Sequence, residues 1–272
     1  MRQQITIGDR KLSYLEVGKG EVLLLIHAFP LSAEMWQSQL SVVPQGWRVI
    51  APDIRGFGKS DSVRLGNSNQ TSSIDDYAGD IVALLKQLKI NRVVICGLSL
   101  GGYIAFGLLR LVPERVRGLI ISGSRLEEDS EKTRELRQEM QVLVDQEGAA
   151  AVARQMVPRL LSEATRDQNG AVVSRVAEMI ESASPLAIKC ALQCLMTRPD
   201  STSVLESFGG PTLLLAGEED LLIPPGEVQR MRRLIERATF IVVPCAGHLV
   251  NLERPDEFNI ALAKFLAENF SS

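Results

Sequence analysis

Six short runs of mostly apolar residues recur along the chain, and each has the length of a β-strand. They lie at residues 22–26, 48–51, 93–96, 119–121, 212–216 and 240–243. Within each run the apolar residues are contiguous, which is typical of strands buried on both faces. Helical patterns separate the runs, and this alternation favours an α/β fold: a mostly parallel, twisted sheet with helices on both faces. Residues 4–17 are expected to form a hairpin at one edge, turning at Gly8-Asp9.

The segment between the fourth and fifth runs has a different pattern. No strand-like run lies between residues 125 and 199, and apolar residues recur there at helical spacing. We therefore predict one α/β core interrupted by a helical insertion. The expected boundaries are residues 1–124 for the first part of the core, 125–208 for a helical cap and 209–272 for the second part of the core.

Composition argues against several classes of function. The net charge is only −3 and no block of like charges occurs, so neither nucleic acid nor a membrane is an expected partner. Residues 1–6 contain no apolar stretch of signal-peptide length, which indicates a cytoplasmic protein. The chain has two histidines, and its four cysteines form no C-x-x-C pair, so no metal site is expected.

A G-x-S-x-G pattern at residues 97–101 is the strongest chemical motif. It follows the buried run at 93–96 and opens a helical pattern. A serine on such a turn adopts a strained backbone conformation and projects its hydroxyl above the sheet. Glycines are needed on both sides, because a Cβ there would collide with the neighbouring strand or helix. The motif therefore predicts Ser99 as a catalytic nucleophile.

A serine hydroxyl needs an adjacent base, and a histidine base needs a partner that fixes its tautomer. His248 follows the run at 240–243, and Asp220 follows the run at 212–216. Both therefore lie at the carboxyl edge of the predicted sheet, the same edge as Ser99. The order Ser, Asp, His is the one that this kind of fold uses. We expect Ser99, Asp220 and His248 to form a catalytic triad.

A second loop at that edge, residues 27–30, is expected to complete the site. Pro30 restricts Phe29 to an extended conformation, which would turn the Phe29 N–H into the site beside the N–H of Leu100. Two such donors would form an oxyanion hole. His27 is expected to brace this loop by hydrogen bonding.

Together these motifs resemble the α/β-hydrolase superfamily over essentially the whole chain. They are residues 97–101 (GLSLG), 27–30 (HAFP), 52–60 (PDIRGFGKS), 217–224 (GEEDLLIP) and 247–248 (GH). Within the superfamily the resemblance is strongest to small carboxylesterases, 3-oxoadipate enol-lactonases and cofactor-free haloperoxidases (perhydrolases). It implies that Phe29 and Leu100 supply the oxyanion-hole amides. Ala28 departs from the glycine usual at its position, and Ser99 stands where haloalkane dehalogenases and epoxide hydrolases have aspartate.

The expected function is that of a serine hydrolase that cleaves a small carboxylic ester or lactone through an acyl-enzyme on Ser99, with no cofactor. Enol-lactonase, perhydrolase and C–C hydrolase activities use the same triad and stay open, as does a ligand-sensing receptor on a hydrolase scaffold. Substrate-binding residues are expected in the cap, with Met140 and Met156 as candidates. The cap arginines are expected to form mainly a solvated face, but one turned inward would select a substrate with a carboxylate. They are Arg134, Arg137, Arg154 and Arg159.

Overall fold

The computed structural model describes residues 1–61, 73–235 and 237–270. In these ranges eight strands form one sheet in the order β1-β2-β4-β3-β5-β6-β7-β8. The β1–β2 and β2–β4 pairs are antiparallel, and the others are parallel. The strands are β1 (Arg2–Ile7), β2 (Arg10–Gly18), β3 (Glu21–Ile26), β4 (Trp47–Pro52), β5 (Val93–Leu98), β6 (Val116–Ser122), β7 (Thr212–Gly217) and β8 (Ala238–Val243). The predicted fold class and the predicted edge hairpin are confirmed.

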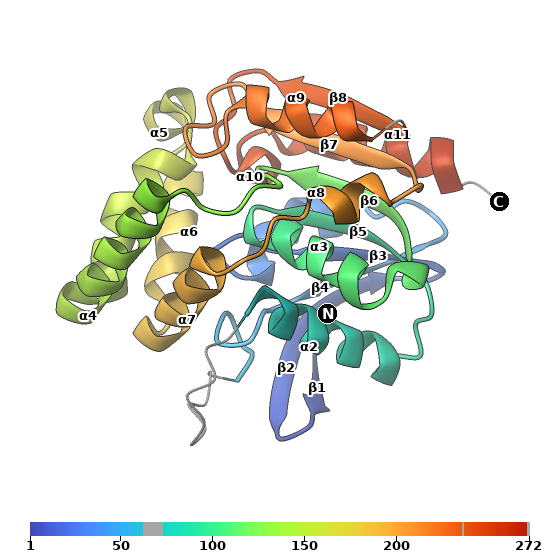
Figure 1. Ribbon diagram of the computed structural model, residues 1–272, viewed down its shortest axis with the longest axis horizontal. Helices are drawn as coiled ribbons and strands as arrows, with labels where there is room; N and C mark the ends of the chain where they lie inside the picture. Colours follow the sequence, from blue (N-terminus) through green and yellow to red (C-terminus); the bar gives the residue numbers. More distant parts are fainter. Residues whose placement is uncertain (62–72, 236, 271–272) are drawn as a thin grey trace.

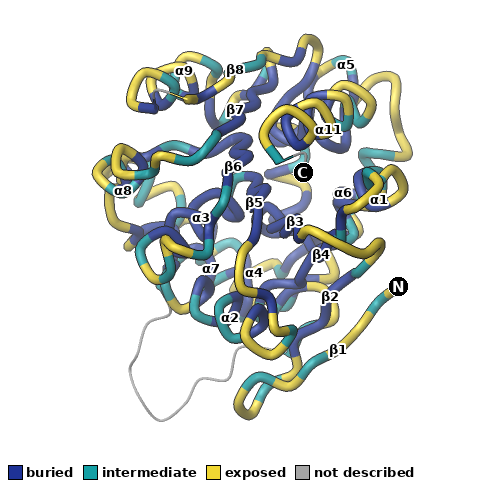
Figure 2. The backbone as a smooth tube through the Cα atoms, turned by 90° about the vertical axis from the view of Figure 1, so that its right-hand side faces the viewer, coloured by how far each residue is buried: buried dark blue, intermediate teal, exposed yellow. Residues whose placement is uncertain are grey.

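The contiguous apolar runs became strands because most of them are covered on both faces. Every residue of β5 and of β7 is buried. One face of the sheet is covered by α2 (Ile74–Gln87), α3 (Leu100–Leu111) and α9 (Pro225–Leu234), and the other by α1 (Gln37–Leu40), α10 (Val250–Glu253) and α11 (Pro255–Phe270) (Figures 1 and 2). The exception is β8, whose central residues are only partly covered because it is an edge strand of the sheet.

Helices fill the segment between β6 and β7. They are α4 (Glu131–Leu160), α5 (Glu163–Gln168), α6 (Gly170–Glu181), α7 (Pro185–Met196) and the short α8 (Thr202–Glu206). We call α4 to α7 the cap helices, since they lie together at one end of the sheet (Figure 1). Helix α4 is interrupted at Gly148, whose φ of 75° is non-helical. The domain boundaries at residues 125 and 208 stay a prediction.

A buried ion pair joins the two chain segments that connect the cap helices to the sheet. Asp129 precedes α4 and Arg198 follows α7, and Arg198 Nη1 donates to Asp129 Oδ1 at 2.5 Å. The Arg198 guanidinium also lies 4.4 Å from the centre of the Tyr103 ring on α3. Burial raises the pKa of Asp129, but Arg137 and Arg198 outweigh this effect, so its pKa is lower than usual. The ion pair therefore fixes the base of the cap helices against α3.

Within the described part of the chain, no helix combines the length and the hydropathy needed to cross a bilayer.

Candidate active site

Ser99 lies in a sharp turn between β5 and α3. Its φ of 55° and ψ of −113° are unusual for a residue with a side chain, as the sequence predicted. A Cβ on Gly97 would lie 2.4 Å from the carbonyl oxygen of Gly101, and one on Gly101 would lie 2.1 Å from that of Ile26. The need for glycine on both sides of Ser99 is therefore confirmed: one makes room for the helix and the other for the adjacent strand.

His248 and Asp220 lie together in neighbouring loops beyond β8 and β7. His248 Nδ1 is 2.8 Å from Asp220 Oδ2, and both side chains are almost completely buried. The other carboxylate oxygen, Oδ1, accepts hydrogen bonds from the backbone N–H groups of Leu222 at 2.8 Å and Ile223 at 2.9 Å. The carboxylate is thus held so that one oxygen faces the imidazole.

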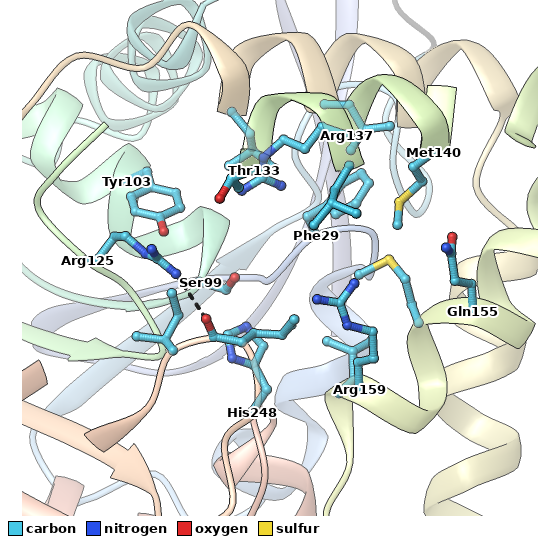
Figure 3. A pocket seen from close by; sticks show the side chains of 17 residues that line it. Phe29, Ser99, Tyr103, Arg125, Thr133, Arg137, Met140, Gln155, Arg159 and His248 are labelled. Carbon is cyan, nitrogen blue, oxygen red and sulfur yellow. Dashed lines mark hydrogen bonds between the residues drawn. The ribbon is translucent and has the colours of Figure 1, made fainter. Parts of the chain in front are cut away.

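Ser99 and His248 line the same cavity, which has a volume of about 210 Å³ (Figure 3). Gly123, directly after β6, makes room for the imidazole: its φ is +57°, and a Cβ there would lie 2.8 Å from His248 Cε1. Sequence analysis did not identify Gly123. Its position after a buried strand at the same edge as Ser99 is the signal that could have found it.

The loop that holds His248 is anchored by a second buried carboxylate, that of Glu253 at the end of α10. Glu253 Oε1 accepts hydrogen bonds from the N–H groups of Gly247 at 3.0 Å and Leu249 at 3.2 Å. The N–H of His248 itself donates to the carbonyl oxygen of Leu160 on α4 at 3.0 Å. Sequence analysis missed Glu253 as well. An acidic residue within an otherwise apolar stretch after His248 was the available signal.

The two backbone donors expected to bind an oxyanion have no acceptor in the described part of the chain. Phe29 and Leu100 are both buried, and neither backbone N–H makes a hydrogen bond to another described residue. Buried N–H groups are almost always paired, so two unpaired ones near Ser99 are free to bind a ligand atom. The Phe29–Pro30 peptide bond is cis, which the sequence analysis did not foresee.

His27 lies behind this loop, outside the cavity lining. Its Nε2 accepts a hydrogen bond from the N–H of Ile54 at 2.9 Å, and its Nδ1 lies 2.9 Å from the carbonyl oxygen of Ala28. Burial lowers its pKa, which favours the neutral ring, and because Nε2 accepts from Ile54, the ring proton lies on Nδ1. Asp53 accepts a hydrogen bond from the N–H of Ala33 at 2.8 Å and holds the other end of the loop. The bracing role expected of His27 is confirmed.

The cap helices supply most of the apolar wall of the cavity. Met140 and Met156, the two methionines expected to bind substrate, both line it. The other apolar lining residues of α4 and α7 are Leu136, Leu160, Leu192 and Leu195. No group of His, Cys, Asp and Glu side chains in the described ranges is placed to hold a metal ion. The cavity is therefore a mainly apolar chamber whose lining also includes Ser99, His248 and Phe29.

Comparison with known proteins identifies the family of this chain. A family model described as the alpha/beta hydrolase fold matches residues 21–255. A thermophilic esterase from Thermogutta terrifontis, solved with malate bound, is 34% identical with a TM-score of 0.93, and the alignment covers 100% of both chains. The 3-oxoadipate enol-lactonase 2 of Acinetobacter baylyi is 25% identical over 96% of this chain and 95% of its own length.

A relative with a different named substrate is also similar. The 2-hydroxy-6-oxo-6-(2'-aminophenyl)hexa-2,4-dienoic acid hydrolase of Metapseudomonas resinovorans is 23% identical over 97% of this chain and 90% of its own length. The family model spans most of the chain, and the Thermogutta esterase aligns along all of it. The chain therefore belongs to the alpha/beta hydrolase fold family.

Proposed function

We propose that this hydrolase cleaves a small carboxylic ester or lactone through an acyl-enzyme on Ser99, with His248 as general base and Asp220 as its orienting partner. The observation that carries the proposal is the pairing of His248 Nδ1 with Asp220 Oδ2 at 2.8 Å, in a loop whose imidazole lines the same cavity as Ser99. The Thermogutta esterase and the Acinetobacter enol-lactonase support an ester or lactone as the substrate class.

The geometry suggests a role for each group in the first half of the reaction. When the Nδ1–H of His248 donates a hydrogen bond to Asp220, Nε2 carries the lone pair that accepts the Ser99 hydroxyl proton. Ser99 Oγ then attacks the carbonyl carbon, and the negative charge develops on the carbonyl oxygen. The unpaired N–H groups of Phe29 and Leu100 stabilise that charge, and each such donor contributes roughly 10²- to 10³-fold in rate.

His248 then gives its proton to the leaving alkoxide, the C–O bond breaks, and the acyl group stays on Ser99, which completes the first half. In the second half, water loses a proton to His248 and attacks the acyl carbon. His248 returns that proton to Ser99 Oγ as the acyl–oxygen bond breaks, which releases the carboxylic acid. Met140 and Met156 contact the acyl part, since they form the adjoining wall.

C–C bond hydrolysis is the competing reaction, because the Metapseudomonas relative, named for a different kind of substrate, is similar over nearly the whole chain. A panel of short alkyl esters, enol-lactones and vinylogous 1,5-diketo acids, together with an assay of peracid formation, separates the candidate reactions by kcat/KM. A ligand-sensing role would instead give tight binding with turnover below about one per minute on every ester, whereas typical enzymes turn over at about 1–10³ s⁻¹.

The direct test replaces the nucleophile. Ser99→Ala is expected to reduce hydrolysis of p-nitrophenyl acetate to near background and to abolish labelling by a fluorophosphonate, which mass spectrometry would otherwise detect on the peptide that contains residue 99. Ser207→Ala is the control, since Ser207 is exposed and lies outside the cavity lining. Full activity in Ser99→Ala would remove Ser99 from the mechanism.

A further inference from the structure

The charged side chains that line the cavity beside Ser99 are all arginines. They are Arg125, Arg137 and Arg159, and among the described residues no Asp or Glu contributes to the lining. The chain as a whole carries a net charge of −3, so this local excess runs against the overall balance. A mainly apolar cavity whose charged lining residues are all cationic favours an anionic ligand, provided that one of those cations is free of a protein partner.

Two of these arginines are already engaged by protein groups. Arg125 Nε lies 3.2 Å from a carboxylate oxygen of Glu227, and its Nη2 donates to the carbonyl oxygen of Leu222 at 3.0 Å. Arg137 Nε donates to Asp129 at 2.5 Å. Their charges are therefore largely balanced, and their side chains are held in place.

Arg159 differs from the other cap arginines. Arg134 is paired with Glu128 and Arg154 with Glu147, at 2.8 and 2.9 Å. Arg159, in the last turn of α4, makes no ion pair or hydrogen bond through its side chain to any residue in the described ranges. Figure 3 shows its guanidinium directed into the cavity between His248 and Met140. It is the cap arginine turned inward with its donors available.

We propose that Arg159 binds a carboxylate on the acyl part of the substrate, so that the preferred substrates are half-esters of small dicarboxylic acids or lactones that bear a carboxylate. A guanidinium presents parallel N–H groups that match the two oxygens of a carboxylate. Met140 and Met156 form the apolar wall beside it, which suits the methylene chain between the carboxylate and the scissile carbonyl. The carboxylate belongs to the acyl part, since that part occupies the cavity through both halves of the reaction.

This inference rests on the proposed hydrolase function, and the experiment compares two esters that differ in charge. Monoethyl glutarate carries a carboxylate at the end of a short acyl chain, and ethyl pentanoate is its neutral counterpart. Wild-type protein is expected to prefer monoethyl glutarate by kcat/KM. Arg159→Gln is expected to lower the ratio of the two kcat/KM values about tenfold, the low end for a charge-assisted hydrogen bond because Arg159 is exposed to solvent.

Matched variants separate charge from general effects on the helix. Arg159→Lys keeps the positive charge and is expected to restore part of the ratio. Arg154→Gln lies on the same helix, is exposed and does not line the cavity, so its ratio should equal that of the wild type. An Arg159→Gln ratio equal to the wild-type ratio would overturn the proposal.

A binding measurement tests the anion site without turnover. Calorimetric titration of the Ser99→Ala variant with glutarate should show binding about tenfold tighter than that of the double variant with Arg159→Gln, and the difference should shrink at high salt. If the chain hydrolyses esters but glutarate affinity is the same with and without Arg159→Gln, the hydrolase proposal stands and the proposed role of Arg159 fails. If no ester is hydrolysed but glutarate affinity depends on Arg159, the anion site stands and the reaction must be reassigned.

Discussion

The carboxylate of Glu253 accepts a hydrogen bond from the backbone N–H of Ser162 at 2.7 Å, although the two residues are 91 positions apart. Ser162 is the N-cap residue of α5, one of the cap helices, and the same carboxylate accepts hydrogen bonds from the N–H groups on either side of His248. One buried side chain therefore joins the histidine loop to the cap helices. The position of the imidazole depends on where those helices lie.

Replacing Glu253 should shift the loop that holds His248, although Glu253 itself does not line the cavity. Glu253→Ala leaves three buried N–H groups without their acceptor, and each costs about 1–3 kcal/mol, so we expect the free energy of unfolding to fall by about 3 kcal/mol or more. Urea denaturation measures this loss. In the fraction that stays folded, kcat for ester hydrolysis should fall while KM changes little, which a purely structural role would not produce. Glu257→Ala, an exposed glutamate on α11, should behave as the wild type.

Gly123→Ala should displace the imidazole of His248. The added Cβ would lie 2.8 Å from Cε1, and misplacement of a catalytic group by about 1 Å costs on the order of 10²-fold in rate. We therefore expect kcat/KM to fall roughly 10- to 100-fold. Gly8→Ala has the same kind of backbone strain, with φ of +61°, but nothing lies within 4 Å of its Cβ. Equal activity losses in the two variants would assign the effect to strain alone.

Asp129→Ala should destabilise the protein far more than the loss of a surface ion pair. It would leave the buried guanidinium of Arg198 without its carboxylate, and breaking such a pair from one side costs about 3–5 kcal/mol. Glu147→Ala removes the exposed partner of Arg154 and should cost less than about 1 kcal/mol. Chemical denaturation of both variants checks the comparison. Similar losses in the two would mean that the buried pair contributes nothing special.

The free energy of unfolding should fall at mildly acidic pH because His27 is buried as a neutral ring. Burial lowers the pKa of His27 below its ordinary value of 6.5, so the unfolded chain takes up a proton at that position before the folded one does. The contribution of the neutral His27 to the free energy of unfolding is therefore complete above pH 6.5. It decreases as the pH falls below 6.5, by up to about 1.4 kcal/mol per pH unit. Protonation would also place a proton on Nε2, opposite the N–H of Ile54.

Denaturation curves between pH 5 and pH 8 measure this dependence. His27→Gln keeps an acceptor near the Ile54 N–H but does not titrate, so its stability should depend less on pH over that range. If the pH dependence of the variant matches that of the wild type, another group is responsible.

The sequence predicted the strands and the turn at Ser99 well, since their causes are local. Contiguous apolar residues favour burial wherever the sheet forms, and the turn itself requires the glycine at 97, since a Cβ there would lie 2.4 Å from the carbonyl oxygen of Gly101. The capping box of α2, formed by Ser73 and Asp76, also has a local cause. Edge position was less predictable: β8 has an apolar run like the others, but only the order of strands reveals that one side of it is open.

The roles of Glu253 and Arg159 were decided by the tertiary structure. Periodicity places Arg154 and Arg159 on one helix, but it does not tell which of them meets a carboxylate and which faces the cavity. Likewise, the sequence marks Glu253 only as an acidic residue after a mostly apolar stretch, and it does not tell that the N–H groups of Ser162, Gly247 and Leu249 converge on it. Interactions between residues that are close in the sequence can be predicted from the order of residues along the chain. Interactions between residues that are far apart in the sequence depend on how helices and loops pack, because only packing sets the distance between their atoms.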